Sequence, residues 1–290
     1  TTEIYTLSLH DALPICLILS SDDVTRQEWR DFFQALNLKE HYPGILALGY
    51  TVMLKAEERA AYEKQVRQEG FPDFAISPRG DRPVYSSIHL IEPFSERNQR
   101  AFGYDMYSDP TRRAAMELAR DRNSAALTSR VTLVQEDGHD IQAGTVLYMP
   151  VYRPGRPLET TAQRRQALLG FVYSPFRMGD LMTDILGHWG RELDFEIYDG
   201  APFSEANRLY ATRSGITDSS GIRRTQVTLA LPMREWTLRF QSTPAFEAEL
   251  PQHSPLIILA TGGTISLLLL QLLRSLAREV RQQQGNQAAL

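Results

Sequence analysis

The chain has 290 residues, of which 42% are hydrophobic and 23% are charged, with 18 glycines, 16 prolines and one cysteine. This composition excludes collagen, a wholly disordered chain and a small disulfide-stapled domain. The net charge of −4 offers no general basic field, which disfavours nucleic-acid binding. A single cysteine cannot form an intrachain disulfide or a cysteine-rich zinc site.

The first 16 residues, TTEIYTLSLHDALPIC, do not begin with Met, and Pro14 interrupts a pattern that fits neither a helix nor a strand. They lack the basic start and long apolar core of a signal peptide. Segment 1–16 is interpreted as an adaptor-like sequence foreign to the native protein, with the only cysteine, Cys16, at its end. We expect an export signal or a first membrane helix to precede Leu17 in the native protein.

Apolar residues recur with regular periods along the rest of the chain, and these periods predict helices and strands. An amphipathic helix is expected over 24–36, with Trp29 and Phe33 on its apolar face. Further helices are expected over 55–68, 110–121 and 176–187. Strands are expected over 45–54, 84–91, 126–135, 144–152, 167–173, 193–198, 208–212, 224–231 and 235–242. Residues 153–165 are expected to form a polar loop.

The helix expected over 110–121 has a clear start signal. The Asp109 side chain can cap it, and Pro110 suits its first turn, where a backbone N–H is not needed. The residues expected on its buried face are Ala114, Ala115, Leu118 and Ala119.

This order of elements predicts an α+β fold of antiparallel sheets with helices on one face. The expected organisation is an N-terminal helix region over 17–41, a membrane-distal subdomain over 42–175 and a membrane-proximal subdomain over 176–250. The two subdomains divide near 174–177, and each is expected to be PAS-like in shape.

The run 256–273, LIILATGGTISLLLLQLL, has no charged residue and one glutamine. As a helix it would be about 27 Å long, close to the thickness of the hydrocarbon core of a membrane. We therefore expect a transmembrane helix. A buried core helix is the alternative, although soluble helices of this length rarely lack a polar face.

Three arginines, Arg274, Arg278 and Arg281, follow the run against one acidic residue. Such an excess places residues 274–290 in the cytoplasm, as the start of a linker helix. Residues 17–255 are then periplasmic or extracellular, and the protein is embedded in the inner membrane. The pair Gly262-Gly263 allows close approach of a partner helix, so a homodimer is expected.

Known catalytic and phosphate-binding sequence motifs are absent from the chain. The adjacent His139 and Asp140 suit either a metal site or a solvated turn. Asp105 and Asp109 suit either an acid–base pair or, for Asp109, the helix cap. His89 and Glu92 suit a structural hydrogen bond. No catalytic residue, metal site or cofactor is expected in this fragment.

Six segments, in unbroken order, resemble the CHASE domain. They are YPGILALGYTV (42–52), YSSIHLIEP (85–93), NQRAFGYDMYSDPTRRAAMELARD (98–121), ALTSRVTLVQE (126–136), GTVLYMPVY (144–152) and LLGFVYSPFR (168–177). The resemblance covers about residues 26–245. It implies the external sensor of a membrane receptor, with a long N-terminal helix followed by two PAS-like subdomains. Plant members of the family bind cytokinin in the membrane-distal one.

The resemblance does not imply cytokinin as the ligand here. An acidic residue helps to bind the adenine-like ring in the plant receptors, and its position is taken by Pro83, with Asp81 out of register. Thr128 matches a threonine that lines the plant pocket, and packing through its methyl group is the alternative. Arg112 and Arg113 suit either an anionic ligand or solvent. The candidate ligand-binding residues are His89, Tyr104, Asp105, Thr128, Tyr148 and Val172.

The expected function is therefore the ligand-sensing module of a transmembrane receptor in a signalling pathway such as a two-component system. Its partners are a small molecule and a second copy of the chain, held through the N-terminal and transmembrane helices. The fragment itself is not expected to be an enzyme, whereas the full-length protein is expected to carry a histidine kinase or diguanylate cyclase. A membrane-anchored extracytoplasmic enzyme or solute-binding protein without cytoplasmic output is the alternative.

Overall fold

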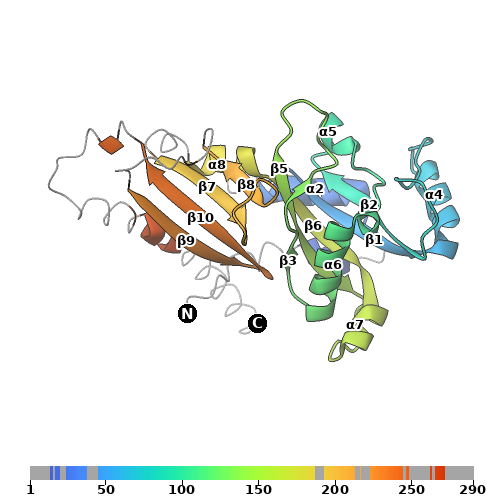
Figure 1. Ribbon diagram of the computed structural model, residues 1–290. Coiled ribbons are helices and arrows are strands. Elements are labelled where there is room, and N and C mark those ends of the chain that lie inside the picture. Colours follow the sequence, from blue (N-terminus) through green and yellow to red (C-terminus); the bar gives the residue numbers. More distant parts are fainter. Residues whose placement is uncertain are drawn as a thin grey trace.

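The computed structural model describes residues 14–15, 17–19, 24–37, 45–186, 193–212, 216, 223–243, 246–247, 262 and 265–271. In these residues the strands form a six-stranded sheet, ordered β2-β1-β6-β5-β3 with β4 beside β5, and a four-stranded sheet, ordered β8-β7-β10-β9. All their pairings are antiparallel. The four-stranded sheet lies at one end of the molecule and α4 at the other (Figure 1). The expected α+β fold with antiparallel sheets is confirmed.

The first sheet and its helices extend to residue 177. Its strands are β1 (Leu48–Lys55), β2 (Val84–Glu92), β3 (Ala126–Leu127), β4 (Val131–Thr132), β5 (Ala143–Tyr152) and β6 (Leu168–Arg177). Its helices are α2 (Arg26–Leu36), η1 (Ala56–Glu58), α4 (Arg59–Gln68), α5 (Glu96–Gln99), η2 (Met106–Ser108), α6 (Pro110–Arg122) and α7 (Thr161–Ala167). The second sheet follows, with α8 (Met178–Leu186), β7 (Leu193–Asp199), β8 (Arg208–Ala211), β9 (Arg224–Leu231) and β10 (Arg234–Ser242).

Helices cover both faces of the first sheet, which corrects the expectation of one covered face. On one side, the α2 face, Trp29 packs with Tyr50 and Val172. On the other, the α6 face, Met116 packs with Tyr148. The reason lies in the central strands, which are apolar at successive positions and buried on both sides, so each side needs a cover.

Helix α2 is the described part of the expected N-terminal helix. It has 11 residues and begins at a capping box formed by Thr25 and Glu28. It ends at Asn37, whose φ of 45° stops the helical hydrogen bonding. The neighbouring segments 20–23 and 38–44 lie outside the described residues.

Three local expectations differ from the structure. The strand expected over 126–135 is two short strands, because the chain turns after Leu127. Helix α7 lies in the expected loop and begins at a capping box between Thr160 and Gln163. On α6, Ala114 and Leu118 are exposed, while the buried stripe is Arg112, Ala115, Met116 and Ala119.

The expected membrane span 256–273 falls mostly outside the described residues, which include only Gly262 and 265–271 of it. Among the described residues, no helix is long and apolar enough to cross a membrane. Segment 274–290 and most of 1–16 also lie outside them.

The two sheets share a hydrophobic core. Leu127 and Leu147 of the first sheet pack with Met182 of α8 and with Phe195 of β7. The Leu127 N–H also donates to the carbonyl of Pro232, in the turn between β9 and β10, at 3.2 Å. The end of the first sheet near β3 is thus part of the packing of the second.

Candidate functional site

The six candidate ligand-binding residues do not all meet. Tyr104 and Tyr148 belong to the core on the α6 face. Val172 lies on the α2 face against Trp29. His89 lies at a bulge of β2, with Nδ1 3.0 Å from the Tyr62 hydroxyl. One ligand therefore cannot touch all six.

Two tyrosines stand in the middle of the α6-face core. Tyr148 is fully buried, and its hydroxyl donates to the sulfur of Met106 at 3.2 Å. Tyr173 pairs with Tyr148 across β5 and β6, with ring centroids 6.4 Å apart. The Tyr173 hydroxyl is buried and has no hydrogen-bond partner among the described residues. Burial raises the pKa of both phenols well above the usual value, so both are neutral at physiological pH.

The backbone under Tyr173 is adapted to the ring. Gly49 lies opposite Tyr173 on β1, and a Cβ at Gly49 would come within 2.4 Å of the ring. Only glycine leaves room for the ring in this position. The site residue Tyr173 was missed from sequence, although strand alternation places it on the face opposite to Val172.

Arg112 is a second buried polar group, only 4% exposed. Its guanidinium pairs with Asp109 at 3.0 Å, donates to the Thr132 carbonyl at 2.7 Å, and lies 5.5 Å from the centroid of the Tyr104 ring. Its Nε is buried and has no partner among the described residues. Arg113, by contrast, is exposed. The two arginines are therefore not equivalent. Arg112 is buried, so the alternative that solvent surrounds its guanidinium does not apply to it.

Asp105 is completely buried at the edge of β2. Its carboxylate accepts hydrogen bonds from the backbone N–H groups of Ser86 at 2.7 Å and Tyr107 at 3.1 Å, and from Arg82 Nε at 2.7 Å. These contacts fasten the turn that carries Tyr104 to the sheet. The structure gives Asp105 a positioning role in that turn.

Asp109 accepts a hydrogen bond from the Arg112 N–H at 2.8 Å, which confirms its role as the cap of α6.

Thr128 joins β3 to β5 through two hydrogen bonds. Its hydroxyl accepts from the Val146 N–H at 3.0 Å, and its own N–H donates to the Val146 carbonyl at 2.9 Å. Two residues later, Arg130 binds the second sheet, donating from N–H to Asp199 at 3.3 Å and from Nε to the Arg208 carbonyl at 3.0 Å. Thr128 is thus held by its hydroxyl as well as by packing.

The His139–Asp140 turn is engaged with protein groups. The His139 N–H donates to Asp137 at 3.0 Å, and Asp140 accepts from Gln142 and Arg177, each at 3.1 Å. In the part of the chain that the structure describes, no group of three or more metal-type ligands gathers.

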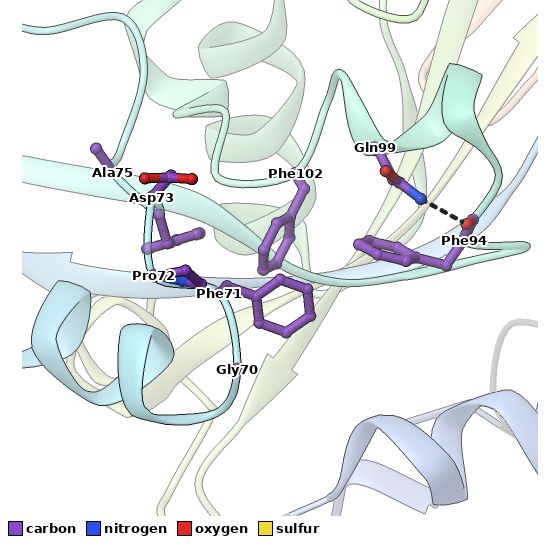
Figure 2. A pocket seen from close by; sticks show the side chains of 9 residues that line it. Gly70, Phe71, Pro72, Asp73, Ala75, Phe94, Gln99 and Phe102 are labelled. Atoms are coloured by element: carbon purple, nitrogen blue, oxygen red, sulfur yellow. Dashed lines mark hydrogen bonds between the residues drawn. The ribbon is translucent and has the colours of Figure 1, made fainter.

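An aromatic cleft of about 350 Å³ is lined in part by Phe94, which also packs against the α6-face core. Its lining includes Phe71, Asp73, Phe94, Gln99 and Phe102, none of which was a candidate from sequence (Figure 2). A smaller adjoining hollow reaches α2, at Arg26 and Trp29. We call the larger hollow the phenylalanine cleft.

Comparison with known proteins assigns the family. The family model described as the CHASE domain matches residues 22–210, and the chain belongs to this family. No curated protein matches the chain.

Two solved structures show a limited similarity to this chain. One is the periplasmic sensory domain of the Campylobacter jejuni chemoreceptor Tlp1, with a TM-score of 0.47, 7% identity, and coverage of 86% of this chain and 92% of that one. The other is an extracellular ligand binding receptor from Desulfohalobium retbaense, with a TM-score of 0.38 and 9% identity. This match covers 81% of the present chain and 41% of the receptor chain.

Proposed function

We propose that this CHASE domain is the extracytoplasmic ligand-sensing module of a membrane receptor, and that the α6-face core binds a small molecule. The observation that carries the site is the Tyr173 hydroxyl, which is buried without a partner among the described residues. Its neighbour Tyr148 has a weak acceptor, a thioether sulfur. Buried polar groups are nearly always hydrogen-bonded, so a partner from outside the chain is the simplest account.

The polar atoms in this core suggest the chemistry of the ligand. The Arg112 Nε–H can only donate, and the Tyr173 hydroxyl is free to donate. A small molecule with carbonyl or carboxylate oxygens would satisfy them. We propose Tyr104, Arg112, Thr128, Tyr148 and Tyr173 as the binding residues. His89 and Val172 lie elsewhere, and Asp105 holds the turn.

The membrane arrangement belongs to the same proposal. The uncharged run 256–273 and the arginines after it support a single transmembrane helix with 274–290 in the cytoplasm. The output attached to it would be a histidine kinase or a diguanylate cyclase. The glycine pair Gly262-Gly263 supports a homodimer in the membrane.

The test is a thermal-shift screen of the full chain in lipid nanodiscs against small carboxylic acids, amino acids and adenine-like compounds. A ligand that binds only the folded state raises the unfolding temperature. We expect one class to do so, and expect Tyr173→Phe to remove the shift while the protein stays folded. Tyr50→Phe, a change at a buried tyrosine on the α2 face, is the matched control and should keep it. The proposal is wrong if no class stabilises the protein, or if Tyr173→Phe responds as the wild type does.

A further inference from the structure

The phenylalanine cleft is built around Phe102. The ring centroid of Phe102 lies 4.9 Å from that of Phe71 and 5.6 Å from that of Phe94. All three rings are partly exposed, which is unusual for so large an apolar group of side chains. The volume of about 350 Å³ falls within the range of small-molecule sites. An aromatic body of one ring would fit within it.

The cleft offers two side-chain acceptors. Asp73 is exposed and is the charged side chain of the lining, and no cation pairs with it among the residues that the structure describes. Gln99 donates its amide nitrogen to the Phe94 carbonyl at 3.2 Å, which leaves its amide oxygen to accept (Figure 2). The cleft therefore offers a negative charge and a neutral acceptor beside the rings.

The chain itself places a cation on these rings. The Arg26 guanidinium of α2 lies 4.7 Å from the ring centroids of both Phe71 and Phe102. Glu69 neutralises it at 3.1 Å. The aromatic faces are thus already used as a cation-binding surface from the α2 side. The Asp73 carboxylate is available to a second cation on the cleft side.

We propose that the phenylalanine cleft is a binding site for a small aromatic amine in its ammonium form. The aromatic body packs against Phe102, and the ammonium group donates to the Asp73 carboxylate. An anion is disfavoured by Asp73, and an uncharged apolar molecule gains no ionic contact with that carboxylate. Of the residues that line this cleft, Phe94 alone also packs against the α6-face core, and the cleft does not depend on the function proposed for that core.

The experiment is isothermal titration of the full chain, in nanodiscs of zwitterionic lipid, with phenethylammonium. Empty nanodiscs provide the blank. We expect saturable binding that Asp73→Asn weakens at least fivefold, since a charge-assisted hydrogen bond is lost. Asp81→Asn makes the same charge change at an exposed aspartate outside the cleft lining and should leave the affinity unchanged. Neutral 2-phenylethanol and the anion 3-phenylpropionate should bind at least fivefold more weakly than the amine. Ethylammonium, which has the charge but no ring, should also bind more weakly than phenethylammonium.

The proposal is overturned by the absence of saturable binding, by equal losses in the two aspartate variants, or by equal binding of the alcohol, of the anion or of ethylammonium. Tyr173→Phe separates the two sites. It should leave phenethylammonium binding intact, and loss of binding in that variant would place the amine in the α6-face core instead.

Discussion

Arg177, the last residue of β6, donates from Nε to a carboxylate oxygen of Glu136 at 2.7 Å, and both side chains are almost fully buried. The same guanidinium pairs with Asp180 of α8 at 2.8 Å. These hydrogen bonds, led by that to Glu136, raise the pKa of Arg177 above its already high value. The pair lies where the chain leaves the first sheet for the second.

Removing one partner of this pair should be costly. Arg177→Met leaves the Glu136 carboxylate buried without its cation, and we expect a loss of about 3–5 kcal/mol in the free energy of unfolding. The double variant Arg177→Met, Glu136→Leu removes both charges and should recover most of that loss. Urea denaturation of the two variants measures this. A double variant less stable than the single one would show that the residues act through other contacts.

Thr128 should affect stability through its hydroxyl. Thr128→Val keeps the shape but leaves the buried Val146 N–H without its side-chain acceptor, and we expect a cost of about 1–3 kcal/mol. Thr128→Ser keeps the acceptor and should cost less than Thr128→Val. Thr128→Ile adds overpacking of about 1–3 kcal/mol to the same loss. Denaturation midpoints that rank Ser below Val would contradict this account.

We expect Asp105 to contribute to the stability of the fold rather than to contact the ligand directly. Asp105→Asn replaces an acceptor oxygen with an amide nitrogen that faces protein donors, and we expect a loss of about 1–3 kcal/mol. The turn carrying Tyr104 should then exchange its amide hydrogens faster. Hydrogen exchange of residues 103–108 reports this. Unchanged exchange together with lost ligand response would indicate a direct ligand contact instead.

Asp121 should make stability depend on pH in acid. Hydrogen bonds from Arg165, and then from Arg120, hold the pKa of Asp121 well below its usual value of 3.8. Because the unfolded chain takes up the proton first, this stabilisation is present above about pH 4 and is lost as the pH falls through the lower folded-state value.

Asp121→Asn should lower the unfolding temperature at pH 7 and flatten its fall in acid. Arg165→Gln should do the same, and the two changes together should do little more than either alone. If the two changes lower the unfolding temperature by purely additive amounts, Asp121 and Arg165 do not stabilise the fold as a pair.

The helices and strands that could be predicted from the sequence are those with a regular apolar pattern or a clear helix cap. Strands β2, β5, β9 and β10 were expected nearly in full, because each is a stretch rich in β-branched and aromatic residues. The start of α6 was also expected, since Asp109 and Pro110 suit the first turn of a helix. Helix α7 was not, because it buries little beyond Ala167 and its signal is the cap at Thr160.

The candidate site was harder to predict because a strand does not reveal its partner's register. Tyr148 and Val172 both lie in strands rich in apolar residues, and the sequence analysis placed them in one pocket. In the structure Tyr148 pairs with Tyr173, so Val172 points to the opposite face. The cleft around Phe102 could not be expected either, since its rings come from three separate loops.

The turn at 128–130 belongs to both sheets. Thr128 is bonded to β5, and Arg130 is bonded to Asp199 and Arg208. Together with the packing of Leu127 and Leu147 against Phe195, these hydrogen bonds join the two halves through buried contacts. The halves should therefore melt as one cooperative unit, giving a single calorimetric peak whose van't Hoff and calorimetric enthalpies agree.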